Sequence, residues 1–167
     1  MTGVTVLSRQ RACTVIHPNI TIKSFRRAED GDRELSFYRR FPWACPPLIY
    51  TAPGVIVTET NPVAGNNPDQ QPAHELFQLL QRLTAKHVHH RDVHPANIVL
   101  TEDGPKLIDW ETAIVDPGPS YDLLGPDASG IPMPDVHAEC GAQWWNSDDE
   151  NSIRNRWGVD INDLMGT

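Results

Sequence analysis

The feature that most constrains the fold of this chain is a pair of short apolar segments joined by a tight-turn signal. The segments are residues 98–101 and 106–110, and Asp103 and Gly104 lie in the connection between them. An Asp-Gly pair between two apolar runs is typical of a β-hairpin, because glycine adopts the positive φ angles that tight turns need. We therefore predict an antiparallel hairpin here.

This hairpin would bring three polar residues together. Its second strand runs back to the end where the first began, so Asp109 is expected near Asn97, with Asp92 in the preceding loop close to both. Carboxylate and amide oxygens are hard ligands that magnesium accepts beside substrate phosphates. A second aspartate beside them can orient a hydroxyl nucleophile. The segment thus predicts a site for a metal ion and phosphate groups.

Alternating β-branched and apolar residues dominate the first sixty positions. Residues 4–7, 13–16 and 20–25 predict an antiparallel three-stranded meander, and residues 55–60 predict a further strand. Residues 30–41 place apolar side chains on one side of a charged stretch, which favours a helix that ends at the following prolines. This part of the chain should form a small antiparallel sheet with one helix.

The later part of the chain has a different character. Residues 61–72 are rich in proline, asparagine, glycine and glutamine, and predict a connector. Leucines and a phenylalanine at helical spacing then predict an amphipathic helix over residues 73–86. Residues 116–134 are rich in proline and glycine, so the next regular element expected is a helix between 148 and 157.

Composition limits the classes of function and location. The chain has 22 acidic and 14 basic residues, and this net charge of -8 argues against a nucleic-acid partner. Its start lacks the pattern of a signal peptide and no apolar run is long enough to span a bilayer, so a cytoplasmic protein without membrane contact is expected. Three widely spaced cysteines, Cys13, Cys45 and Cys140, predict reduced and mostly buried thiols.

The loop before the hairpin resembles the catalytic loop of the protein kinase family. His90, Arg91 and Asp92 are followed by Asn97 five residues beyond the aspartate, which matches the pattern H-R-D-x-x-x-x-N. The resemblance implies that Asp92 accepts the proton of the acceptor hydroxyl and that Asn97 holds a magnesium ion. In this family His90 is structural and packs beneath the loop.

The residues around Asp109 extend the resemblance and indicate which branches of the kinase-like superfamily are most similar. Asp109, Trp110 and Glu111 stand where protein kinases have D-F-G, which implies that Asp109 is the second metal ligand. The tryptophan after this aspartate, together with His94 and Pro95 in place of Lys-Pro, is similar to the aminoglycoside phosphotransferase, choline kinase and bacterial lipopolysaccharide kinase branches.

A kinase-like catalytic loop implies partners upstream in the chain. Lys23 ends a V-A-I-K type of strand pattern, and Glu34 lies eleven residues later on the expected helix. In the family such a lysine holds the α- and β-phosphates of ATP and the glutamate orients it, so an ion pair between the two is expected. Glu59 and Thr60 fall where the family binds adenine through the backbone of its hinge.

The resemblance also implies the fold. We expect an α+β, protein kinase-like bilobal domain, with a small antiparallel-sheet N-lobe over residues 1–60, a hinge or connector over 61–72 and a truncated, mainly helical C-lobe over 73–167. The implied cofactors are ATP and Mg²⁺, and the implied activity is ATP-dependent transfer of a phosphoryl group to an alcohol.

Departures from the family pattern are equally clear. No G-x-G-x-x-G loop stands between the first two strands, where Arg9 and Arg11 are expected to supply compensating charge to the nucleotide. Glu111 replaces the glycine of D-F-G. The short connection between Glu59 and His90 favours a protein serine or threonine acceptor over a small molecule, although a small-molecule kinase stays open.

Two further alternatives come from other classes. The missing glycine loop and the short C-terminal part suit a kinase-shaped binding or regulatory module, and a partner chain or second copy joined through the C-terminal segment around Trp144 and Trp145 would complete such a lobe. The histidines at 87, 89, 90 and 94 suggest a zinc hydrolase, but the H-x-H-x-D-H pattern of that class is not met.

Overall fold

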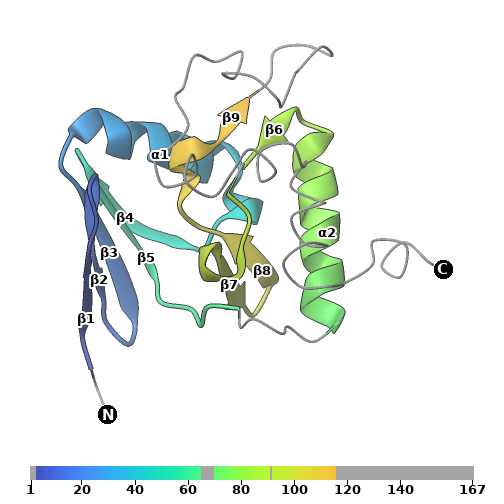
Figure 1. The fold of residues 1–167 in the computed structure, drawn as a ribbon, viewed down its shortest axis with the longest axis horizontal. Coiled ribbons are helices and arrows are strands. Elements are labelled where there is room, and N and C mark those ends of the chain that lie inside the picture. The colour runs from blue at the N-terminus through green and yellow to red at the C-terminus, as the bar shows by residue number, and fades with distance from the viewer. Residues whose placement is uncertain (1–2, 65–69, 91, 116–167) are drawn as a thin grey trace. The chain divides into compact units, whose positions relative to one another are not determined.

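A computed structural model describes most of the first 115 residues of the chain. The described ranges are 3–64, 70–90 and 92–115. The chain divides into two compact units, the first formed by Met1–Pro62 with Val99–Glu111, the second by Val63–Ile98 with Thr112–Thr167. Figure 1 shows the elements of both units in chain order.

The first unit is built on a five-stranded antiparallel sheet. Its strands run in the order β1-β2-β3-β5-β4. They are β1 (Thr5–Ser8), β2 (Ala12–Ile16), β3 (Ile20–Phe25), β4 (Leu48–Ala52) and β5 (Val55–Glu59). The three-stranded meander and the strand after residue 55 are confirmed, because β1 pairs with β2, β2 with β3, and β3 with β5. The family-typical small antiparallel sheet is therefore present.

Strand β4 is an element that the sequence analysis did not predict. Among the described strands it lies at the edge of the sheet and pairs with β5 alone, with a register irregularity between Leu48 and Tyr50. Pro46 and Pro47 directly before it indicate the end of a helix. The Leu-Ile-Tyr run that follows them has high β propensity, which is consistent with the observed strand. Leu48, Ile49 and Tyr50 are exposed, as an edge strand permits.

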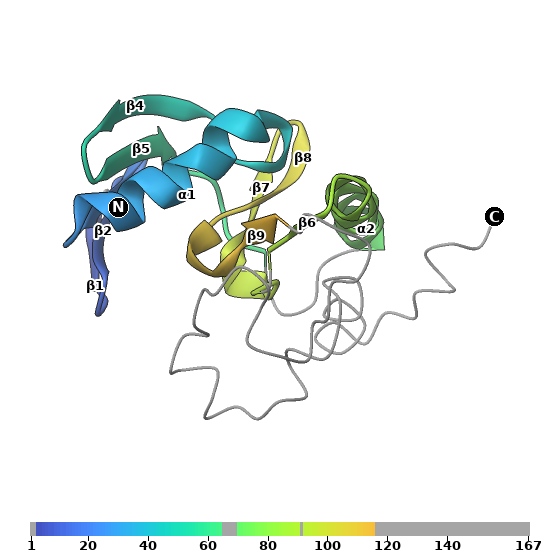
Figure 2. The same ribbon diagram turned by 90° about the horizontal axis from the view of Figure 1, so that it is seen from above.

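One long helix of the first unit packs against the sheet. Helix α1 (Ala28–Arg40) contacts β3 and β5 and begins two residues before the predicted start. Figure 2 shows it lying alongside the sheet. A Cβ atom on Gly31 would lie 2.8 Å from Cα of Gly54, which itself has a φ of +68° in the turn between β4 and β5. Only two glycines allow the helix to approach this turn so closely.

The predicted hairpin is present, with a shorter second strand than expected. Strand β7 (Ile98–Thr101) pairs with β8 (Gly104–Leu107), and the Thr101 hydroxyl donates a hydrogen bond to the Gly104 carbonyl across the turn. Asp109 leaves the strand because its φ is +65°, a left-handed conformation that ends a β ladder. The next residues form the 3₁₀ turn η3 (Trp110–Thr112).

A short turn after α1 packs against the hairpin in the first unit. The short turn η1 (Pro42–Ala44) follows this helix and packs against β8, where Lys106 Nζ donates a hydrogen bond to the Trp43 carbonyl at 2.9 Å. Cys45, which follows the turn, is buried, and burial raises the pKa of its thiol far above the ordinary value. Cys13 and Cys45 are free, as predicted, and Cys140 lies outside the described residues.

In the second unit, one amphipathic helix packs beside a two-stranded ribbon. Helix α2 (Gln70–Thr84) begins inside the predicted connector, three residues before the predicted start, and contacts β6 (Val88–His89). Strand β6 pairs with β9 (Ile114–Val115). The core is made of apolar side chains from these elements and the following loop: Leu76, Phe77, Leu79, Leu80, Leu83, Val88, Val93, Ile98, Ala113 and Ile114.

Several predictions fall beyond the described residues. They include the helix between 148 and 157, the segment 116–134 and most of the expected C-lobe, so the bilobal arrangement stays a prediction. Among the helices that the structure describes, none has the length and apolar character needed to cross a membrane.

Candidate functional site

Lys23 forms the centre of an ionic network in the first unit. Its Nζ lies 2.7 Å from Glu34 Oε2 and 2.7 Å from Asp109 Oδ1. The ion pair that the sequence predicted between Lys23 and Glu34 is therefore present. The side chain of Glu34 is only 1% exposed, whereas that of Asp109 is 38% exposed. The buried carboxylate of Glu34 thus holds the lysine inside the unit, and the carboxylate of Asp109 is accessible to solvent.

The local sequence explains why Lys23 points towards α1. On β3 it stands opposite Thr14 of β2 and Ile56 of β5, in the middle of the sheet. Alternation along a strand puts Lys23 and Phe25 on the same face. The Lys23 Nζ accordingly lies 5.0 Å from the centre of the Phe25 ring, which adds a cation–π contact.

Burial and charge oppose each other in this network. Burial alone would lower the pKa of Lys23, but the carboxylates of Glu34 and Asp109 raise it above its ordinary value. Burial raises the pKa of Glu34 to about 7, and the Lys23 ammonium limits that rise. Lys23 is therefore a cation at physiological pH, and the charge of Glu34 depends on pH in that range.

The segment after Asp109 is held by residues of α1 that the sequence analysis did not single out. The Trp110 ring is fully buried and stacks on Phe37 with ring centres 5.3 Å apart. Its indole N–H donates to the Leu107 carbonyl at 3.0 Å, and Arg33 donates to the Glu111 carbonyl at 2.5 Å. Arg33, Glu34 and Phe37 are spaced one and three residues apart, so one face of α1 holds the whole segment.

In the second unit, Asp92 and Asn97 are tied to each other. Asn97 Nδ2 donates to Asp92 Oδ2 at 2.8 Å and to the Asp92 carbonyl at 3.0 Å. His94 Nε2 lies 3.5 Å from the same Asp92 Oδ2. The turn η2 (Pro95–Asn97) closes this loop, because the Asn97 N–H donates to the His94 carbonyl.

These bonds orient the side-chain amide of Asn97 and leave its oxygen, Oδ1, for a metal ion. Both protons of its amide nitrogen point to Asp92, so the amide is oriented with Oδ1 turned away from that residue. Within the described residues, no hydrogen bond to Asn97 Oδ1 is present. An amide oxygen and the exposed carboxylate of Asp109 are hard donors of the kind that magnesium takes. The donor chemistry of both residues therefore fits this ion.

His90 is structural, in keeping with the expectation from the sequence. Its side chain is fully buried, and the Asp92 N–H lies 3.3 Å from its Nδ1 as a hydrogen-bond donor. The Thr112 hydroxyl donates to the His90 carbonyl at 3.0 Å, which joins the loop to the end of η3, two residues before β9. Arg91 lies outside the described residues.

Comparison with known proteins bears on this arrangement. The family model of the phosphotransferase enzyme family, named APH, matches residues 26–125, which is more than half of the chain. The chain belongs to this family. The match includes Glu34, Asp92, Asn97 and Asp109, and it begins three residues after Lys23.

A curated relative of this phosphotransferase chain has a kinase name. A probable serine/threonine-protein kinase of Thermomonospora curvata, PkwA, is 42% identical over 78 residues. The aligned part covers 43% of this chain and 10% of that protein. The chain thus spans about a tenth of the length of this relative.

The histidines do not assemble a metal centre in the part of the chain that the structure describes. No group of three or more histidine, cysteine, aspartate or glutamate side chains close enough to hold a metal ion occurs in the described ranges. The zinc hydrolase alternative therefore gains no support from the geometry, and membership of a phosphotransferase family favours a different chemistry.

The predicted adenine edge has its backbone donors engaged. The Glu59 N–H donates to the Pro47 carbonyl and the Thr60 N–H to the Asn19 carbonyl. The Thr60 hydroxyl is also occupied, by Thr21 and by the His17 carbonyl. Any base contact at these positions must therefore use their carbonyl groups or the neighbouring Asn61.

Arg9 and Arg11 lie on the turn between β1 and β2, where the resemblance to protein kinases implied a glycine-rich loop. The Arg9 N–H donates to the Ala12 carbonyl at 2.8 Å, which closes the turn within a few residues. Arg9 is exposed and Arg11 is half-buried. A turn of this length presents side chains in place of the row of backbone amides that a glycine-rich loop would offer.

Proposed function

We propose that this phosphotransferase-family chain transfers the terminal phosphoryl group of ATP to a hydroxyl acceptor. The observation that carries the proposal is the network of Lys23, Glu34 and Asp109. A lysine fixed by a buried glutamate beside an exposed aspartate is the arrangement that places a cation against phosphates and a carboxylate beside their metal ion.

Lys23 binds the α- and β-phosphates, and Glu34 positions it. Because Glu34 is buried and bonded to Nζ, the ammonium is restricted before nucleotide arrives, which reduces the entropy lost on binding. The second bond of Lys23, to Asp109, is exchanged in part for phosphate oxygens. Glu59 and Thr60 line the adenine through their carbonyl groups, because their N–H groups are engaged.

Asn97 Oδ1 and the Asp109 carboxylate hold magnesium. When bound, the ion neutralises charge on the phosphates. Asn97 immediately precedes β7 and Asp109 follows β8 by two residues, so the hairpin connects the two ligands through the chain. Their convergence is a prediction of the hairpin topology.

Asp92 is the proposed base that receives the proton of the acceptor hydroxyl. Asn97 fixes it through two hydrogen bonds, and His94 lies beside the same carboxylate oxygen. Most of the rate enhancement then comes from positioning and charge neutralisation, because a loose phosphoryl transition state needs little covalent help.

For the acceptor we propose a protein serine or threonine hydroxyl, consistent with the name of the curated relative. The alternative is a small-molecule alcohol, which the similarity of His94, Pro95 and Trp110 to the small-molecule kinase branches favours. Incubation of the full chain with labelled ATP, magnesium and either a denatured cell extract or a panel of sugars and amino alcohols separates them. Label in protein supports the first acceptor class, and label in small products overturns it.

The reaction itself is tested on the full chain with Mg-ATP. We expect phosphoryl transfer or ATP turnover, reduced about 10³-fold in Asp92→Asn because a positioned base contributes that order of rate. Nucleotide affinity should be retained in this variant. Absence of turnover in the natural chain, with no effect of Asp92→Asn, contradicts the proposal, and nucleotide binding without turnover supports a regulatory module.

A further inference from the structure

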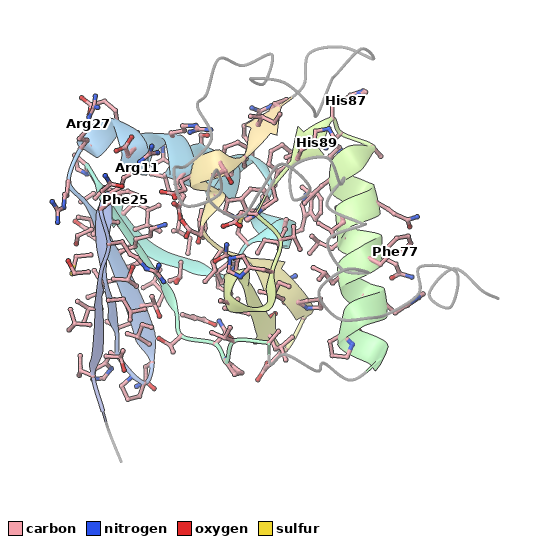
Figure 3. All side chains as sticks on the ribbon, in the orientation of Figure 1. Arg11, Phe25, Arg27, Phe77, His87 and His89 are labelled. Atoms are coloured by element: carbon pink, nitrogen blue, oxygen red, sulfur yellow. The ribbon has the colours of Figure 1, made fainter. Side chains whose placement is uncertain are left out.

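One end of the sheet in the first unit gathers four arginines, which we call the arginine cluster: Arg9, Arg11, Arg26 and Arg27. The first two lie on the turn between β1 and β2, and the last two join β3 to α1. The Arg26 N–H donates to the Arg11 carbonyl at 2.9 Å, so the two segments lie side by side. Figure 3 shows Arg11 and Arg27 at the same end of the sheet as Phe25.

Within the described residues, three of the four arginines in this cluster have no carboxylate partner. Among the described residues, Arg9, Arg11 and Arg26 form no ion pair with a carboxylate. Arg27 has a partner in Glu29 at 3.8 Å, but both side chains are about three-quarters exposed, at 74% and 77%. Such exposed pairs hold their partners weakly. This concentration of cations stands out in a chain with a net charge of -8.

The start of α1 adds a second feature at this end. Arg27 is the N-cap residue, and its side chain makes no capping hydrogen bond. The N–H groups of a first helical turn have no partner within their helix and are suited to anions. Glu29 and Asp30 in that turn reduce the attraction of the helix dipole for an anion. The arginines therefore supply the electrostatic attraction, and the backbone amides supply hydrogen-bond donors.

Phe25 separates this end from the proposed nucleotide site. Its ring contacts the Lys23 ammonium at 5.0 Å, and its Cδ2 lies 2.9 Å from the position of a Cβ on Gly31, in the first turn of α1. The ring therefore packs against both the Lys23 ammonium and the first turn of α1, which directly follows Arg26 and Arg27 in the chain. We expect a phosphate held by the arginine cluster to be separate from the phosphates bound at Lys23.

We propose that the arginine cluster binds a phosphate monoester that does not belong to the nucleotide. A planar guanidinium donates two parallel hydrogen bonds to a phosphate, and several arginines from two segments can surround its oxygens. The source of the group is either a free phosphorylated molecule or a phosphorylated protein segment. The site differs from the earlier expectation that Arg9 and Arg11 serve the nucleotide, and it does not depend on phosphoryl transfer.

The test uses the full chain and inorganic phosphate as the probe, titrated calorimetrically with and without a saturating, non-hydrolysable Mg-ATP analogue. We expect binding in both conditions, weakened at least about tenfold in the double variant Arg11→Gln/Arg26→Gln, because charge-assisted bonds dominate such sites. The double variant Arg39→Gln/Arg40→Gln removes the same charge from the other end of α1 and should change phosphate affinity by less than about twofold.

The two sources are separated by a phosphoserine peptide and by serine phosphate as a free molecule. Tighter binding of the peptide assigns the group to a protein, and equal binding assigns it to a free ligand. The proposal is overturned if the nucleotide analogue displaces phosphate and Arg11→Gln/Arg26→Gln binds the nucleotide more weakly. The arginines would then bind the phosphates of the nucleotide. Absence of phosphate binding to the natural chain also overturns it. Asp92→Asn, which changes a residue of the second unit, should leave phosphate binding intact while it lowers phosphoryl transfer, and this keeps the result independent of the proposed kinase activity.

Discussion

Two regions supply the residues proposed for catalysis, and they are held in different ways. The Lys23 network of the first unit joins residues that are 11 and 86 positions apart in the chain. The loop of the second unit is held by bonds between Asp92, Asn97 and His90 that span only two to five positions. The first region depends on tertiary packing, whereas the second is largely organised by its own short segment.

This difference predicts different responses to mutation. Removal of one member of the Lys23 network leaves a charge in the buried space between α1 and the sheet, and so affects the stability of the whole unit. Removal of a loop member alters local geometry, with a larger effect on catalysis than on stability. The following variants measure that contrast.

The largest effect on stability is expected for Lys23→Met, which leaves the carboxylate of Glu34 buried without its cation. The free energy of unfolding should fall by about 3 kcal/mol, measured by urea denaturation, because a broken buried ion pair costs about this much. Lys106→Met is the matched control, since in the described part of the chain Lys106 bonds to the carbonyl groups of Trp43 and Asp103 and to no carboxylate. The double variant Lys23→Met/Glu34→Gln should recover part of the loss. Equal stability of Lys23→Met and the natural chain contradicts the description of the network.

The next effect tests how closely α1 must approach the sheet. In Gly31→Ala the new methyl group meets Cα of Gly54 at 2.8 Å, so the helix has to move. We expect a loss of about 2 kcal/mol, the usual range for an overpacked contact, together with weaker nucleotide binding because Glu34 moves with the helix. Gly3→Ala is the control, since no atom lies within 4 Å of its Cβ position. Unchanged thermal stability in Gly31→Ala would show that the helix position is not restricted by this contact.

A smaller loss of stability is expected in the loop. Asn97→Ala removes both hydrogen bonds to Asp92 and should cost about 1 kcal/mol in unfolding free energy. The rate of phosphoryl transfer should fall much further, because the proposed base Asp92 loses its orientation and the proposed metal-ligand oxygen of Asn97 is removed. Gln78→Ala removes a single exposed bond to the His74 ring at 2.9 Å, away from the proposed site, and serves as the control. A stability loss as large as that of Lys23→Met would remove the contrast between the two regions.

The smallest effect is a dependence on pH that arises in the Lys23 network. The pKa of Glu34 is about 7 in the folded chain against an ordinary 4.5, so the folded state binds this proton more readily than the unfolded state. Acidification from pH 7 towards 4.5 therefore adds to stability through this group, and a rise in pH through the same window removes that contribution. Nucleotide affinity should change in the opposite direction and weaken by a few fold below pH 7, because neutral Glu34 no longer attracts Lys23 through charge. Calorimetric titrations of nucleotide at pH 6 and pH 8 measure this change, which should disappear in Glu34→Gln.

The same contrast explains what the sequence could predict. The spacing of Asp92 and Asn97 is visible in the chain because the loop is local. The Lys23–Glu34 pair was expected from the resemblance to the kinase family, which implies a strand lysine and a glutamate on the next helix. The Arg33 bond to the Glu111 carbonyl has no such signature, because a backbone acceptor 78 positions away can be any residue. The left-handed conformation of Asp109 is equally invisible, since an aspartate occurs in many conformations. Strand β4 was not predicted for a different reason. The prolines before it indicate a break in regular structure, although its own residues include β-branched and aromatic types that favour a strand.

The stacking of Trp110 on Phe37 has a practical consequence for spectroscopy. An indole enclosed by another aromatic ring and excluded from water emits at shorter wavelength than an exposed one. Since Trp110 directly follows Asp109 and contacts α1, its emission reports whether the helix and the aspartate segment remain together. Comparison with a Trp110→Phe variant isolates this signal from the other tryptophans, so the chain carries an internal optical reporter at its proposed metal ligand.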